Sequence, residues 1–80
     1  MEFTEYFKNK VLIKRPYLKI EWIENVLRNP HKVEKQTEGN LIRFWGYIEE
    51  LGKYLRIITL EDGITVDNAF PDSNIKEKEI

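Results

Sequence analysis

The chain has 80 residues, a length that suits one domain and excludes a second hydrophobic core. Its apolar share of 41% is enough for one packed core, and its charged share of 34% is of mixed sign. Thirteen basic residues stand against fourteen acidic ones, so the net charge of −1 excludes a global field that attracts nucleic acid, and any such binding needs a local patch.

The first predicted element is a helix from about Thr4 to Leu12. It is indicated by an apolar stripe with helical spacing, which consists of Phe3, Tyr6, Phe7 and Val11. A turn over residues 14–18 follows, because Pro16 disfavours the helical conformation of the residue before it.

A second helix is predicted after this turn and is expected to end at Asn29-Pro30. Its apolar stripe consists of Ile20, Ile23 and Leu27, flanked by Trp22 and Val26. Lys19 stands where a Ser, Thr or Asp cap would be expected, so the start of the helix lacks a side-chain acceptor. We expect packing to stabilise this helix.

From Val33 onward β-branched and aromatic residues dominate, with turn signals at intervals of about a dozen residues. They predict four strands near residues 32–36, 40–48, 53–60 and 64–70. The expected fold is α+β: two N-terminal helices packed on one face of a four-stranded antiparallel β-meander. We expect this single domain to span residues 1–72, with a flexible charged tail over residues 73–80.

Turn lengths predict which strand residues lie opposite each other. A two-residue turn at Asp62-Gly63 pairs Thr59 with Val66, Ile57 with Asn68, and Leu55 with Phe70. A four-residue loop over residues 49–52 pairs Ile48 with Lys53, Phe44 with Ile57, and Ile42 with Thr59. Most of these side chains are apolar, so their face is expected to pack against the two helices.

The opposite face of the predicted sheet is aromatic and basic. It carries Arg43, Trp45, Tyr47, Tyr54 and Arg56, with Asp67 diagonal to Arg56. Such a surface suits the stacking of bases and the binding of phosphates in single-stranded RNA. It equally suits a structural or protein-contact role, in which Trp45 stacks on Arg56. Both interpretations stay open.

Other chemistry has little support in the sequence. The chain has no cysteine and one histidine, His31, so neither a metal site nor covalent Cys/His catalysis is expected, and no cofactor is indicated. Gly46 within a strand predicts a bulge or a close approach by a neighbouring element. No apolar run approaches the roughly 20 residues that span a bilayer.

Five blocks of the sequence together resemble a known pattern. They are Arg15-Pro16-Tyr17-Leu18 and residues 43–48, 52–56, 59–63 and 68–72. The chain thereby resembles, over roughly residues 3–72, a small bacterial domain family related to domain of unknown function 4258. Relatives of that family are often set beside RelE-like and BrnT-like toxins, which pack N-terminal helices on an antiparallel sheet and cut RNA on its open face.

The resemblance implies functional roles for particular residues. Catalytic roles fall to Arg43, Arg56 and Tyr54. Contacts with RNA or a partner fall to Arg15, Trp45, Tyr47, Lys53, Asp67 and Asn68. Related sequences tend to carry histidines where this chain has Asp67 and, in the first helix, near Tyr6, which implies that ribonuclease activity is weak or absent.

The expected function is therefore that of a cytoplasmic, toxin-like domain of a toxin-antitoxin pair that binds RNA or the ribosome. Its expected partner is a small antitoxin-like protein, and no membrane is involved. The alternative is a non-catalytic interaction module whose aromatic sheet face docks a partner protein or a second copy of the chain.

Overall fold

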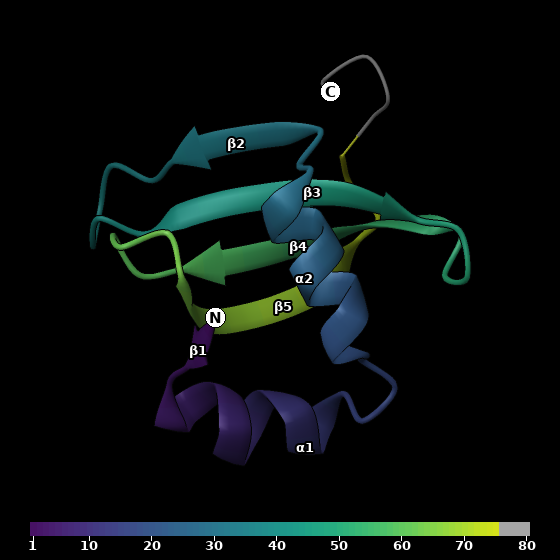
Figure 1. Cartoon of the computed structure of the whole chain (residues 1–80), viewed down its shortest axis with the longest axis horizontal. Coiled ribbons are helices and arrows are strands. Elements are labelled where there is room, and N and C mark those ends of the chain that lie inside the picture. The colour runs from purple at the N-terminus through teal and green to yellow at the C-terminus, as the bar shows by residue number, and fades with distance from the viewer. Residues whose placement is uncertain (76–80) are drawn as a thin grey trace.

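A five-stranded sheet with the order β1-β5-β4-β3-β2 forms the centre of the computed structural model, which describes residues 1–75 (Figure 1). The elements in chain order are β1 (Glu2–Phe3), a π-helical segment η1 (Phe7–Val11), α1 (Leu12–Lys14), α2 (Ile20–Arg28), β2 (Lys32–Lys35), β3 (Ile42–Ile48), β4 (Lys53–Thr59) and β5 (Thr65–Asp72). In Figure 1, α2 crosses one face of the sheet, and the first helix lies beyond the β5 edge. The predicted α+β class is confirmed.

The predicted number of strands is wrong, because β1 adds a fifth. This strand pairs in parallel with β5, through Glu2 with Thr65 and Phe3 with Val66. Two residues are too short to show a strand's alternation of apolar and polar side chains, and the helical spacing of Phe3 concealed its extended conformation. The antiparallel meander from β2 to β5 is confirmed.

The first helix runs from Glu5 to Lys14 and includes the wider π-helical turn of η1. Thr4 holds its start: the Thr4 hydroxyl accepts from the backbone N–H of Phe7 at 3.0 Å and donates to Asp67 at 2.9 Å. Phe7 and Val11 are buried as predicted, whereas Tyr6 is 53% exposed and does not join the apolar stripe.

The second helix, α2, begins directly after Lys19, which makes no side-chain cap, as predicted. Its buried side chains are Trp22, Ile23 and Val26. The predicted stripe is therefore rotated, since Ile20 is 40% exposed. None of the helices within residues 1–75 is long and apolar enough to span a membrane.

Gly46 explains how closely α2 approaches β3. A methyl group built on this glycine would lie 2.9 Å from Cγ2 of Val26, closer than real side chains allow. The close approach predicted at Gly46 is thus confirmed, and the pairing of β3 with β4 continues there without a bulge.

The hydrophobic core lies between the helices and the sheet face that they cover. From the helical third it takes Phe7, Val11, Leu18, Trp22, Ile23 and Val26, and from the sheet Ile48, Leu55, Ile57, Val66 and Ala69. Phe44 is partly buried and packs against this cluster. Trp45 is also buried, at 3% exposure, but lies outside the cluster on the opposite side of the sheet.

The register of the middle hairpin is confirmed along its whole length, including Phe44 opposite Ile57 and Ile48 opposite Lys53. The loop over residues 49–52 has the predicted four residues, and the N–H groups of Leu51 and Gly52 both donate to the carbonyl of Ile48.

The register of the last hairpin is right only near its turn. Thr59 lies opposite Val66 as predicted, but Ile58 lies opposite Asn68, so Asp67 is an extra residue in β5. Beyond this bulge every pairing shifts by one residue, and a one-residue shift moves side chains to the other face. Phe70 therefore lies opposite Arg56, away from the helices, and the predicted pairing with Leu55 is wrong.

The turn of this hairpin is a four-residue loop, not the predicted two-residue turn. It is closed by the bond from the N–H of Leu60 to the carbonyl of Thr65 at 2.9 Å. The Asp62 carboxylate accepts from the N–H groups of Ile64 and Thr65, both at 2.8 Å. Only Gly63 in this loop has a positive φ, whereas the predicted turn needs one at Asp62 as well.

Candidate functional site

The face of the sheet turned away from α2, called the open face below, carries a row of alternating basic and aromatic side chains. Directly opposite residues share a face of the sheet. The row runs from β2 to β5 through Lys32, Trp45, Arg56 and Phe70. It therefore crosses four of the five strands.

Cation–π contacts connect the members of this row. Lys32 Nζ lies 5.3 Å from the centroid of the Trp45 ring, and Arg56 Cζ lies 5.2 Å from it. The Arg56 guanidinium also lies 5.0 Å from the Phe70 ring. Arg15, which follows the first helix, extends the row with its Cζ 5.7 Å from Phe70. Three cations and two aromatic rings thus alternate.

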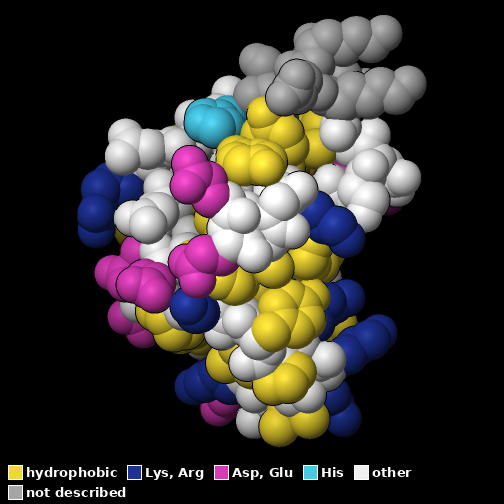
Figure 2. All heavy atoms as spheres, turned by 90° about the vertical axis from the view of Figure 1, so that its right-hand side faces the viewer, with side chains coloured by type: hydrophobic (Ala, Val, Ile, Leu, Met, Phe, Trp, Pro, Cys, Tyr) yellow, Lys and Arg dark blue, Asp and Glu magenta, His cyan; other side chains and the backbone are white. Residues whose placement is uncertain are grey.

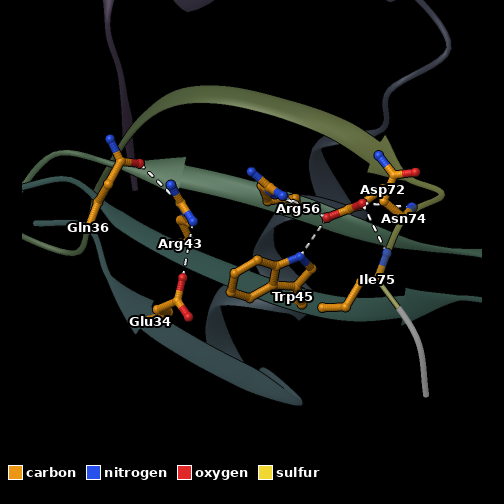
Figure 3. A network of polar contacts seen from close by, with 8 residues as sticks. All are labelled: Glu34, Gln36, Arg43, Trp45, Arg56, Asp72, Asn74 and Ile75. Carbon is orange, nitrogen blue, oxygen red and sulfur yellow. Dashed lines mark hydrogen bonds and ion pairs between the residues drawn. The ribbon is translucent and has the colours of Figure 1, made fainter. Parts of the chain in front are cut away.

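Asp72, at the end of β5, is the acceptor that Trp45 and Arg56 share on the open face (Figure 3). Its Oδ2 accepts from Trp45 Nε1 at 2.9 Å and from Arg56 Nη2 at 2.9 Å and Nε at 3.2 Å. Its Oδ1 accepts from the backbone N–H groups of Asn74 and Ile75. One carboxylate therefore holds two strands and the chain segment after β5 together.

These bonds keep Asp72 ionised although its side chain is only 4% exposed. Desolvation is the largest single influence on its pKa and raises it. The hydrogen bonds from Trp45 and Arg56, with that from the Asn74 N–H, outweigh desolvation, so the pKa of Asp72 lies below its usual range. The charged form is thus favoured in the folded protein.

A second, more exposed pair lies on the same face at Arg43. Arg43 Nη1 donates to Glu34 Oε1 at 3.0 Å, and Arg43 Nε donates to the side-chain oxygen of Gln36 at 3.0 Å (Figure 3). The Arg43 and Glu34 side chains are 31% and 46% exposed, so solvent screens this pair.

An aromatic cluster of Tyr47, Tyr54 and His31 lies at one end of the open face. The Tyr54 ring meets Tyr47 edge to face at 5.2 Å and His31 at 5.8 Å. Tyr47 is 46% exposed, which makes it the most accessible aromatic side chain of β3 and β4.

Beside this cluster lies a hollow of about 370 Å³ between α2 and the end of β3, called the α2–β3 hollow below. Its lining residues are Trp22, Asn25, Val26, Asn29, His31, Gly46, Tyr47, Ile48, Glu49 and Glu50. Figure 2 shows the histidine next to hydrophobic side chains on this side of the molecule, with acidic side chains gathered below it.

Glu50 closes one end of this hollow through contacts with other elements. Its carboxylate accepts from Lys19 Nζ at 2.8 Å and from Trp22 Nε1 at 3.0 Å. The bond from Lys19 is the largest cause of the lowered pKa of Glu50, and the bond from Trp22 is the next. These contacts fasten the β3–β4 hairpin to the start of α2.

The structure brings most of the predicted site residues together on the open face. They are Arg43, Trp45, Tyr47, Tyr54, Arg56 and Asn68, with Arg15 beside Phe70 at the edge. Lys53 is the residue before Tyr54 in β4, so strand alternation places it on the other face. Asp67, which the predicted register put diagonal to Arg56, accepts from Thr4 instead, and the carboxylate partner of Arg56 is Asp72.

Sequence reasoning missed the residues that complete the open-face network, which are Lys32, Glu34, Phe70 and Asp72. Asp72 belongs to the block Asn68-Ala69-Phe70-Pro71-Asp72, and this was the one available signal for it. Trp45, predicted as an accessible surface residue, is buried under its partners.

Among residues 1–75 no group of three or more His, Cys, Asp and Glu side chains is placed to hold a metal ion. Comparison with known proteins found no matching family model, no matching curated protein and no matching solved structure. The geometry of the site therefore carries the functional argument.

Proposed function

We propose that the chain is a toxin-like domain that binds single-stranded RNA, free or on the ribosome, through its open face and does not cleave it. The observation that carries the proposal is the row of Lys32, Trp45, Arg56, Phe70 and Arg15, with Arg43 beside it. Cations spaced across a sheet attract phosphates, and nearby aromatic rings stack on bases.

The charges of the chain are distributed in favour of this face. Across β2, β3 and β4 it carries Lys32, Arg43 and Arg56 against Glu34. By register β5 and β1 add the carboxylates Asp72 and Glu2, with Arg15 at the edge. The β2–β4 part of the face is therefore locally basic in a chain whose net charge is −1. Such a local patch is what RNA binding requires of a chain with balanced charge.

The carboxylates on this face decide which arginine contacts phosphate most readily. Glu34 and Arg43 form an exposed ion pair, worth roughly 0–1 kcal/mol, so a phosphate displaces Glu34 at little cost. The pair of Arg56 and Asp72 is more sheltered and has three hydrogen bonds to the indole and guanidinium. We expect Arg43 to contribute more to binding than Arg56.

Cleavage is not expected because the two carboxylates beside the basic row, Glu34 and Asp72, are engaged by arginines. Attack by a ribose 2′-hydroxyl requires a general base. Glu34 and Asp72 already accept hydrogen bonds from arginines, so the carboxylate oxygens that would take this proton are occupied. The arginines implied as catalytic by the resemblance can bind phosphate and stabilise its charge.

The test is retention of a labelled twelve-nucleotide uridine RNA by the purified protein at low salt. Replacing Arg43 or Lys32 by Gln is expected to weaken binding severalfold and to reduce its salt dependence by about one ion per charge removed. Lys10→Gln, which removes an exposed cation of the first helix, is the matched control and is expected to leave binding unchanged.

Three outcomes would count against the proposal. They are no retention at low salt, equal weakening by Lys10→Gln and Arg43→Gln, and shortening of the labelled RNA during incubation. Shortening of the RNA would support RNA as the ligand and would contradict the proposal that the protein does not cleave it.

The resemblance to RelE-like and BrnT-like toxins supports the toxin part of the proposal. It leads us to expect a small antitoxin-like partner and growth arrest when the chain is expressed without it. A neighbouring reading frame that relieves the arrest on co-expression would support this part. Unimpaired growth at full expression would contradict it.

A second candidate is a non-catalytic interaction module, and one observation favours it. Both open-face arginines already have carboxylate partners within the chain, and Trp45 is covered, which makes the face less available to RNA. In that case the exposed ring of Tyr47 docks a partner or a second copy. A homodimer that persists at high salt and is lost in Tyr47→Ala would identify this function.

A further inference from the structure

The α2–β3 hollow contains a strand edge that the sheet leaves unpaired. β2 pairs with β3 only from Ile42 to Trp45, and β3 continues to Ile48. Residues 29–31, between α2 and β2, are neither helix nor strand, and their one described backbone bond to β3 is from the N–H of His31 to the carbonyl of Trp45. Residues 46–48 of β3 therefore have β4 on one side and the hollow on the other.

The backbone of Tyr47 faces this open side. On the β2 side of β3, the carbonyls of Leu41 and Trp45 accept from Gln36 and His31 at 2.8 and 2.7 Å. Groups that face the same side of a strand recur every second residue, so the N–H and C=O of Tyr47 point the same way, beyond the end of β2. One donor and one acceptor are thus presented for another extended chain.

The polar side chains around this edge also lack partners within residues 1–75. Asn25 and Asn29 of α2, His31 and Glu49 all line the hollow, and none of their side chains makes a hydrogen bond there. Glu50 is held by Lys19 and Trp22. Glu49 is therefore the lining carboxylate without an ion pair in the described chain, and the hollow has a net negative charge.

We propose that the α2–β3 hollow binds an extended peptide segment of a partner protein that carries an arginine or lysine. The peptide backbone pairs with Tyr47, as in the addition of a strand to a sheet edge. The basic side chain lies between the Glu49 carboxylate and the exposed Tyr47 ring, where an ion pair and a cation–π contact reinforce each other. Asn25 and Asn29 offer amide oxygens to its remaining N–H groups.

The proposal does not depend on RNA binding, because none of the cations of the open face lines the hollow, which Tyr47 and His31 reach from the end of that face. Its lining charge attracts a cationic side chain and repels phosphate. The volume of about 370 Å³ accommodates a single long side chain and part of its backbone.

The test is an NMR titration of the folded protein with N-acetyl-arginine N-methylamide, which has two backbone amides and a guanidinium. We expect saturable shifts of the backbone amides of Tyr47 and His31 and of the side-chain amides of Asn25 and Asn29. The citrulline analogue has the same shape without the charge and is expected to bind at least fivefold more weakly.

Glu49→Gln is expected to weaken binding of the arginine probe about fivefold, which corresponds to one exposed ion pair. The matched control is Glu61→Gln, on the tip of the other hairpin, which is expected to bind like the original chain. An unchanged spectrum of each variant before titration shows that its fold is intact.

The proposal is overturned if the arginine probe causes no shifts, if citrulline binds equally well, or if Glu49→Gln binds as tightly as Glu61→Gln. Guanosine that shifts the same amides more strongly than the arginine probe would assign the hollow to a nucleobase instead. Shifts of these amides on dilution without any probe would assign it to a second copy of the chain.

Discussion

The open face and the α2–β3 hollow are neighbouring regions that differ in whether their polar side chains are hydrogen-bonded to one another. On the open face, Arg43, Arg56 and the carboxylates Glu34 and Asp72 bond to one another. In the hollow, Asn25 and Glu49 have no such bonds within residues 1–75. Polar groups that hydrogen-bond to each other stabilise the fold, whereas polar groups that bond only to water are available to a ligand.

Burial explains why the two regions differ. The open face has a covered indole, and a buried indole N–H needs an acceptor, which Asp72 provides. In the hollow the apolar side chains of Val26 and Ile48 are buried, because α2 lies close to β3 at Gly46. The polar side chains lie at the rim of the hollow, in contact with solvent. Substitutions in the two regions should therefore affect different properties.

The largest expected effect is that of Trp45→Ala on the open face. It removes a side chain that is 3% exposed and leaves Asp72 without its indole donor, so the free energy of unfolding should fall by about 3–5 kcal/mol. Urea unfolding followed by circular dichroism measures it. Tyr47→Ala, on the same strand and face but 46% exposed, should cost at most about 1 kcal/mol. Equal losses would remove the distinction between the two positions.

Next in size is Asp72→Asn, which keeps the shape of the side chain and removes its charge. We expect a loss of roughly 2–3 kcal/mol at pH 7, because the Arg56 guanidinium loses its charged acceptor while partly buried. Glu34→Gln is the matched control, since it breaks the exposed pair with Arg43 and should cost under about 1 kcal/mol. A loss as large as that of Asp72→Asn would show that both pairs stabilise the fold.

The contribution of Asp72 should also depend on pH. Its folded pKa lies below the ordinary value of 3.8, so the unfolded chain takes up the proton first as the pH falls. The stability difference between the original chain and Asp72→Asn should be constant above about pH 5 and shrink as the pH falls through the folded pKa. Urea unfolding between pH 7 and pH 2.5 measures it. A stability difference that does not change with pH would mean that the charge of Asp72 does not stabilise the fold.

The smallest expected effects are those of Asn25→Ala and Glu49→Gln in the hollow. Neither side chain has a hydrogen bond within residues 1–75, so stability should change by no more than about 0.5 kcal/mol. Asn25→Ala should even stabilise α2 by a few tenths of a kcal/mol, because alanine favours the helix. A decrease in the free energy of unfolding above about 1 kcal/mol, measured by thermal unfolding, would show that these side chains stabilise the fold.

The strands of the meander and the whole register of the middle hairpin were predictable from the sequence. Alternating side chains and turn residues are local signals, and the loop at residues 49–52 lies between two strands that pair without irregularity. The same count placed Arg43, Trp45 and Arg56 on the side away from the helices, as the structure has them. The start of α2 without a cap and the close approach at Gly46 were local signals too.

The tertiary structure decided what those side chains touch. The extra residue Asp67 in β5 places Phe70 on the open face, and no local pattern predicts this bulge, whose extra residue bonds to Thr4, 63 residues earlier in the chain. The partner of Arg56 is therefore Asp72 and not Asp67, which the predicted register put diagonal to it, and Asp72 also accepts from the buried indole of Trp45. Sequence periodicity determines which way a side chain points, whereas its partners depend on contacts between residues far apart in the chain.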